Sequence, residues 1–185
     1  MIWLRQVHDV LLGCILGLFI SSVPSQSLAQ SALEKSCFVE ERFTGYLPAK
    51  EIEQIIKACS SLIERDGNSA QRALYVRSIG EFTRLVQARL ARMQRRDGSF
   101  EWSNPTHAEF RSALDDLDRA MDLKGEFKAP ALRFRATLNQ FIGNDAAVLM
   151  DLNEAIELDP ANAIAYQQRA LHWERKKEQI GRAHV

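Results

Sequence analysis

The stretch that decides the fold class is residues 144–173, NDAAVLMDLNEAIELDPANAIAYQQRALHW. Its first half carries apolar or small residues at intervals of three or four, the spacing of one packed helix face. These residues are Ala147, Val148, Leu152, Ala155, Ile156 and Leu158. Asp159 and Pro160 then end the helix, because Pro lacks the amide hydrogen that would continue it and disfavours a helical residue before it. A second helix is marked by small and aromatic residues at helical spacing, Ala165, Tyr166, Ala170 and Trp173.

Two sequence patterns recur along the chain at nearly the same interval. The first pattern is Ala73-Leu74-x-x-Arg77-Ser78, Ala131-Leu132-x-x-Arg135-Ala136 and Ala165-Tyr166-x-x-Arg169-Ala170, and its last two copies are 34 residues apart. The second is Asp116-Leu117-Asp118-Arg119-Ala120-Met121 and Asp151-Leu152-Asn153-Glu154-Ala155-Ile156, at an offset of 35. Because two independent patterns give one period, we expect a repeated helix-turn-helix unit.

The chain resembles the tetratricopeptide-repeat family, in particular secreted bacterial members with a cysteine-tied N-terminal segment, and the match is best over residues 105–173. Gly143 lies at the interhelix turn, Ala155 at the small helix-contact position and Pro160 at the repeat end. The resemblance implies an all-α fold, a short right-handed solenoid of stacked helical hairpins in which Tyr166 and Trp173 fill the seam between units. Its structural repeat positions are Arg77, Ala120, Arg135, Ala136, Gly143, Ala155, Pro160, Tyr166, Arg169 and Ala170.

One departure from the family pattern is a longer first unit, since Arg77 and Arg135 lie 58 residues apart. We therefore expect an extended helix at 70–95 and a loop at 97–104, with Asn104 capping the next helix and Pro105 as its first residue. Phe100 and Trp102 in that loop either pack back on the extended helix or form an exposed anchor. The full set of predicted helices is 49–65, 70–95, 105–123, 129–142, 145–158 and 161–179, within a repeat domain at 48–179.

The N-terminal residues 1–29 have the pattern of a secretory signal peptide. An uninterrupted apolar run covers residues 10–20, and Ser27-Leu28-Ala29 supplies small residues before a cleavage point. A membrane anchor is the alternative, but the run is shorter than the roughly 20 residues that span a bilayer. Cys14 lies inside the run and is badly placed for a lipoprotein site. We expect export, to the bacterial periplasm, with no membrane contact beyond the signal peptide.

Removal of the signal peptide leaves two cysteines, Cys37 and Cys59, in a chain sent to an oxidising compartment. Their spacing is far from that of a CxxC redox or zinc site, so we predict a disulfide. Two unpaired buried thiols are the alternative if the protein is cytosolic. Residues 30–47 show weak periodicity, and we expect an irregular lead tied down by Cys37.

Composition argues against several functions. Lys plus Arg and Asp plus Glu both number 24, so the net charge is zero, whereas nucleic-acid or anionic-membrane binding needs a basic excess. The sequence contains no P-loop, dinucleotide Gly fingerprint, GxSxG or HExxH motif. We therefore predict a non-enzymatic protein with no catalytic residue, no metal and no cofactor, whose partner is a protein or peptide.

Histidines and acidic residues also favour plain structural roles. His107 and His184 are expected to have no function, whereas His172 either contacts a partner or is an ordinary surface residue. Four aspartates, Asp115, Asp116, Asp118 and Asp122, flank a buried stripe and are expected to form a solvated face. The recurring Arg77, Arg135 and Arg169 are expected to pair with a carboxylate such as Asp116 or Asp151, since an architectural contact must be rebuilt in every unit.

The resemblance implies a groove lined by the first helix of each pair. Its candidate partner-binding residues are Arg133, Phe134, Thr137, Gln140, Phe141, Gln167, Leu171, His172 and Arg175. Phe134 and Phe141 are equally compatible with the core. The favoured function is a non-catalytic scaffold that binds a partner segment in this groove. The alternative is an accessory region of a longer enzyme or of a secretion or envelope-assembly component. Residues 180–185, IGRAHV, match one reading frame of a common sequencing adapter, which suggests a non-native tail after Gln179.

Overall fold

The computed structural model describes residues 28–39, 47–65, 67, 69–93 and 105–183. This part of the chain is entirely helical, as predicted, and contains no strand. A helix at 28–37 is followed by α2 (Ala49–Arg65), α3 (Ala70–Met93), α4 (His107–Asp122), α5 (Lys128–Ile142), α6 (Asp145–Leu158) and α7 (Ala163–Ala183). None of the described helices is both long and apolar enough to cross a membrane. The predicted signal peptide at 1–29 and the loop at 97–104 lie almost wholly outside the described residues.

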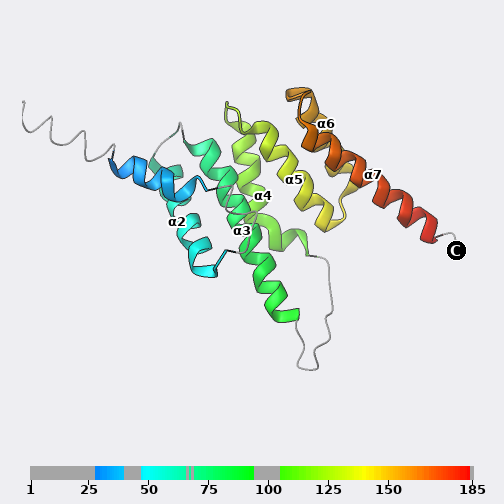
Figure 1. Ribbon diagram of the computed structural model, residues 1–185, viewed down its shortest axis with the longest axis horizontal. Helices are drawn as coiled ribbons and strands as arrows, with labels where there is room; N and C mark the ends of the chain where they lie inside the picture. Colours follow the sequence, from blue (N-terminus) through cyan, green and yellow to red (C-terminus); the bar gives the residue numbers. More distant parts are fainter. Residues whose placement is uncertain (1–27, 40–46, 66, 68, 94–104, 184–185) are drawn as a thin grey trace, which may run out of the picture.

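The helices form an array in which each helix packs against the next one in the chain, from α2 at one side to α7 at the other (Figure 1). The predicted extension of α3 is confirmed in the described residues, since this helix runs for 24 residues and its C-terminal end extends past its neighbours (Figure 1). The C-terminal half of α7 extends beyond α6 at the opposite side (Figure 1).

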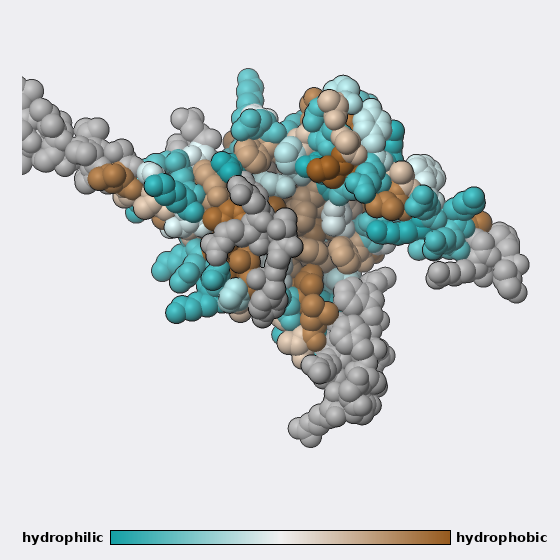
Figure 2. All heavy atoms as spheres, in the orientation of Figure 1, coloured by the Kyte–Doolittle hydropathy of each residue, from teal (hydrophilic) through white to brown (hydrophobic). Residues whose placement is uncertain are grey.

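Small residues let neighbouring helices approach closely. Ala120 and Ala155 are fully buried and Ala136 is 2% exposed, which confirms their predicted contact positions. Ala155 packs with Leu132 and Ile156 between α5, α6 and α7, while Ala120 lies in the core shared by α3, α4 and α5. Figure 2 shows hydrophobic residues gathered over the middle of the array and hydrophilic residues over the outer part of α7.

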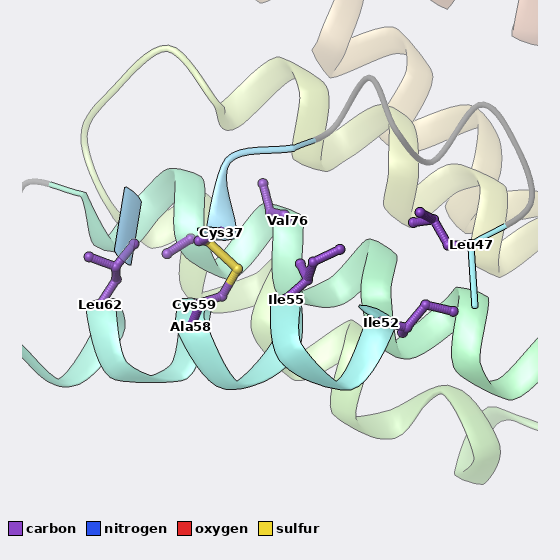
Figure 3. Packing of buried hydrophobic residues seen from close by; sticks show 9 residues of the cluster. Cys37, Leu47, Ile52, Ile55, Ala58, Cys59, Leu62 and Val76 are labelled. Atoms are coloured by element: carbon purple, nitrogen blue, oxygen red, sulfur yellow. A yellow bond between two sulfur atoms is a disulfide. The ribbon is translucent and has the colours of Figure 1, made fainter. Parts of the chain in front are cut away.

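The predicted pairing of Cys37 with Cys59 is confirmed, with Sγ–Sγ 2.16 Å and Cα–Cα 4.9 Å. Both cysteines are fully buried, and they fasten the helix at 28–37 onto α2 among Ile55, Leu62 and Val76 (Figure 3). The prediction of an irregular lead at 30–47 is therefore wrong for its first part. Leu33 and Cys37 lie four residues apart and face the same core, but such a short helix gives only this faint periodic signal.

The helix ends follow the predicted turn chemistry in two places and depart from it in a third. Gly143 closes α5 with φ 84°, and Asn144 accepts a hydrogen bond from the amide of Ala147 to open α6. The helix start predicted at Asn104 and Pro105 is wrong, since Thr106 is the N-cap of α4. The amide and hydroxyl of Thr106 both donate to Glu109 Oε2, at 2.8 and 3.1 Å, and this reciprocal contact fixes the start two residues later.

The expectation that Tyr166 and Trp173 fill a seam is wrong for the described residues. Tyr166 is 43% exposed, Trp173 is 56% exposed, and Ala170 between them is exposed as well. The corresponding residues of α5 are covered by α6, whereas no described helix covers this side of α7. Pro160 does mark the turn after α6, where the amide of Asn162 donates to Asp159 O at 3.0 Å.

Candidate functional site

The repeated arginines join the two helices of a pair. Arg77 on α3 donates through Nε and Nη2 to both carboxylate oxygens of Asp116 on α4, at 2.7 and 2.6 Å. Arg135 on α5 makes the same two-pronged contact with Asp151 on α6, at 3.1 and 2.6 Å. Asp116 is 3% exposed and Asp151 is fully buried, so both carboxylates need this partner. The predicted pairing is confirmed for these two arginines, and the prediction that Asp116 belongs to a solvated face is wrong.

The same arginines also reach back to the preceding helix. The Nη1 atom of Arg77 donates to Ser60 Oγ on α2 at 3.0 Å, and that of Arg135 donates to Asp118 Oδ1 on α4 at 2.6 Å. Arg169 on α7 repeats this contact with Asn153 Oδ1 on α6, at 2.8 Å. Each arginine therefore has one fixed place between the preceding helix and its own unit, which is a structural role.

Arg169 differs from the other two arginines in one respect. Its guanidinium lies 5.4 Å from the ring centroid of Tyr166 and contacts Asn153, but no carboxylate among the described residues pairs with it. The predicted carboxylate partner of Arg169 is therefore absent from the part of the chain that the structure describes.

The protonation of the paired arginines is secured by their partners. The side-chain hydrogen bond from Asp116 raises the pKa of Arg77 above its ordinary value. Burial lowers the pKa of Arg135, but the hydrogen bonds and charges of Asp151 and Asp118 outweigh it and leave that pKa raised. Both guanidiniums thus stay charged and act as fixed donors rather than as proton carriers.

Phe134 and Phe141, two of the candidate partner-binding residues, belong to an aromatic cluster. The ring centroid of Phe82 on α3 lies 5.6 Å from that of Phe134 and 5.5 Å from that of Phe141. Phe110 on α4 completes the cluster at 5.8 Å from Phe82. All these rings pack on the core that contains Leu138. Phe134 and Phe141 are half-buried here, so their main role is to join α3, α4 and α5, which was one of the two alternatives.

Polar candidates on α5 lie where α7 approaches. Gln168 Nε2 donates to Thr137 Oγ1 at 3.1 Å, and Thr137 donates in turn to the carbonyl of Arg133 at 3.2 Å. Arg133 Nε and Gln168 Oε1 are buried atoms without a hydrogen-bond partner among the described residues. Gln140 is half-buried on the same side of α5. Gln168 was missed by the sequence prediction, although the 34-residue offset aligns it with Phe134, which also faces the preceding odd-numbered helix.

Candidates on α7 divide into two sets. Gln167, Leu171 and Arg175 are exposed, with Leu171 at 41%. His172 is only 2% exposed, so its interpretation as an accessible residue is wrong. Its Nε2 lies 3.8 Å from Asp145 Oδ1 on α6 and has no hydrogen-bond partner among the described residues. The physical reason is its register, since the residue 34 positions earlier, Leu138, is fully buried.

The described residues contain several open cavities but no assembled catalytic group. One cavity of about 380 Å³ lies between α3 and α4 and is lined by Phe82, Leu85 and Phe110 together with Glu81 and Glu109. Within the described ranges, no three His, Cys, Asp or Glu residues gather in a way that could hold a metal ion. Glu109 in this cavity is already engaged by Thr106 and Arg89, so its carboxylate serves the helix start.

Comparisons with known proteins give no match to this chain among protein-family models, curated proteins or solved structures.

Proposed function

We propose that this protein is a non-catalytic scaffold of the tetratricopeptide-repeat type that binds a segment of another protein. The observation that supports it most is the register of the repeated arginines. Arg77 and Arg135 make the same contacts to an aspartate in their own helix pair and to a polar group on the preceding helix. A contact rebuilt at this interval is what stacked copies of one helical hairpin require.

The binding surface in this proposal is formed by the odd-numbered helices α3, α5 and α7. These helices contact one another through Tyr75 and Phe134, whose ring centroids lie 6.3 Å apart, and through Thr137 and Gln168. We call this the inner surface, and its residues are Tyr75, Phe82, Arg133, Thr137, Gln140, Gln167, Leu171 and Arg175. Its α3 end is aromatic and its α7 end is polar and basic, so a partner segment with an apolar anchor and an acidic stretch fits it best.

The proposal includes export. Fully buried Cys37 and Cys59 at bonding distance suit an oxidising compartment such as the bacterial periplasm. A free-thiol assay on the native protein, collected from its own cell compartment, tests this part. Two thiols that react after denaturation without reductant would contradict it.

Site-specific photo-crosslinking in the cells that make the protein tests the binding surface. A photoreactive amino acid is placed at Gln140, Gln167 or Leu171 on the inner surface. Matched control positions are Asp115 on α4 and Glu157 on α6, which are exposed on the even-numbered helices. We expect one common partner band from the inner positions and none from the controls. Equal crosslinking from both sets, or bands from the controls alone, would contradict the proposal.

A further inference from the structure

One side of α7 is left open although its counterparts in the preceding helix pairs are covered. We call it the outer face of α7, and it consists of Tyr166, Arg169, Ala170, Trp173 and Lys177. These residues recur at intervals of three or four and so lie on one side of the helix. Tyr166 and Trp173 are 43% and 56% exposed, and Ala170 and Lys177 are exposed too. Exposed aromatic rings beside an exposed alanine resemble a helix contact that lacks its partner.

The repeat shows what covers this face in α5. The equivalent residues 34 positions earlier are Leu132, Arg135, Ala136 and Asn139, which all contact α6. Leu132 packs with Ala155 and Ile156, and Ala136 packs with Val148 and Leu152. Arg135 and Asn139 both donate to Asp151, the latter at 3.3 Å.

The same arrangement holds in the preceding pair. There α3 presents Leu74 and Arg77 to α4, and Leu117 and Asp116 receive them. The helix that covers this face carries the same residues in both cases, Asp116-Leu117-x-x-Ala120 in α4 and Asp151-Leu152-x-x-Ala155 in α6. A covering helix thus supplies a carboxylate to the arginine and a leucine and an alanine to the apolar residues beside it.

Charge argues against a second copy of this chain as the occupant. The ionisable residues of the outer face other than Tyr166 are Arg169 and Lys177, both basic. A symmetric pair of α7 helices would therefore set like charges against one another and supply no carboxylate to Arg169. A helix with an acidic residue at the centre of its apolar stripe complements the face instead.

We propose that the outer face of α7 is a docking site for an amphipathic helix of a partner protein with the pattern Asp-Leu-x-x-Ala. Its aspartate binds Arg169, which already holds Asn153 with one nitrogen. Its leucine and alanine lie against Tyr166, Ala170 and Trp173. This site is separate from the inner surface, because it lies on the side of α7 turned away from Thr137 and α5.

A defined peptide tests the docking site on the full-length, oxidised protein. The probe is the sequence of residues 144–160, labelled with fluorescein and held helical by a staple at the positions of Asn153 and Glu157, which are exposed in α6. We expect one peptide to bind per protein chain, as measured by fluorescence anisotropy. Ala170→Arg should weaken binding at least tenfold, because it places a long charged side chain at the centre of the face. The matched control, Leu171→Ala, lies on the inner surface and should leave the affinity within about twofold.

The proposed ion pair is tested by a double-mutant cycle. Changing the peptide aspartate that corresponds to Asp151 to asparagine should weaken binding to the wild-type protein about tenfold, the effect of losing one charge-assisted hydrogen bond. The same change should have little effect on the Arg169→Gln protein. Independent effects of the two changes, or no binding of the stapled peptide, would overturn the proposal. A dimer of the free protein that Ala170→Arg converts to monomers would overturn it too, in favour of a second copy as occupant.

Discussion

Helices α5 and α7 carry the same short pattern 34 residues apart, yet one is enclosed and the other is open. In α5 the central alanine, Ala136, is 2% exposed and its arginine holds a buried aspartate. In α7 the equivalent Ala170 is exposed, and Arg169 contacts an asparagine and a tyrosine ring. The difference teaches that the pattern encodes a helix surface made to be covered, and that the next helix decides whether it is core.

The largest difference between the two helices is expected from the substitution of their central alanines by arginine. Ala136→Arg forces a charge into the contact with Val148 and Leu152 and should cost more than about 4 kcal/mol, enough to lose the native fold. Ala170→Arg should change the free energy of unfolding by less than about 0.5 kcal/mol. Thermal unfolding followed by circular dichroism measures both, and equal stability of the two variants would break the comparison.

The paired arginines give the next largest effect. Arg135→Gln leaves Asp151 buried without its cation and should destabilise the protein by about 3–4 kcal/mol. Arg169→Gln removes a contact that has no carboxylate and should cost less than about 1 kcal/mol. Urea unfolding of both variants tests this, and the addition of Asp151→Asn to Arg135→Gln should recover part of the loss. A larger loss for Arg169→Gln than for Arg135→Gln would contradict the assignment.

Much of this comparison is predictable from sequence, because periodicity encodes the contacts within a unit. The three-and-four spacing places the helices within a few residues, and the recurrence of Arg77 and Arg135 predicts their aspartate partners. The period also determines the burial of His172, since it aligns this residue with Leu138, although histidine itself gives no such signal.

Other features lie outside the period and cannot be read from it. The inserted part of α3 supplies Phe82, which draws Phe134 and Phe141 into an aromatic cluster. The helix at 28–37 depends on the contact of Leu33 and Cys37 with α2 rather than on its own propensity. The exposure of Tyr166 and Trp173 depends on which helix lies beside them, and no local pattern records that.

The opposite end of the array sharpens the comparison, because it is closed by a disulfide rather than left open. Replacing both Cys37 and Cys59 by alanine should lower the free energy of unfolding by about 3 kcal/mol in the chain-entropy model. Chemical denaturation of this variant, beside the oxidised parent, measures the loss. Reduction of the parent with dithiothreitol should give a similar shift, and no shift in either experiment would contradict a stabilising closure.

The turns before α5 and α7 differ as well, and this difference should have the smallest effect. Before α5, Gln71 Nε2 donates to the carbonyls of Ala120 and Leu123, and its Oε1 accepts from the amide of Phe127. Gly125 in this turn has φ 155°, and a Cβ there would lie 2.0 Å from Gln71 Oε1.

Gly125→Ala should therefore cost about 2 kcal/mol through backbone strain and loss of the Gln71 contacts. The matched control is Gly67→Ala, where an added Cβ meets nothing within 4 Å, and its effect should stay below about 0.5 kcal/mol. Melting temperatures of the two variants check this, and a neutral Gly125→Ala would show that the turn does not depend on Gln71.

Amide hydrogen exchange across the whole chain tests the central claim most directly, namely that α5 is an enclosed repeat helix and α7 an open one. Mass spectrometry of peptic fragments reports the opening free energy of each helix without any substitution. We predict that amides in the middle of α5 and α6 exchange only through global unfolding, and that those of α7 between Ala170 and Gln179 exchange at least a hundredfold faster. Equal protection of α5 and α7 in the free, monomeric protein would contradict the account.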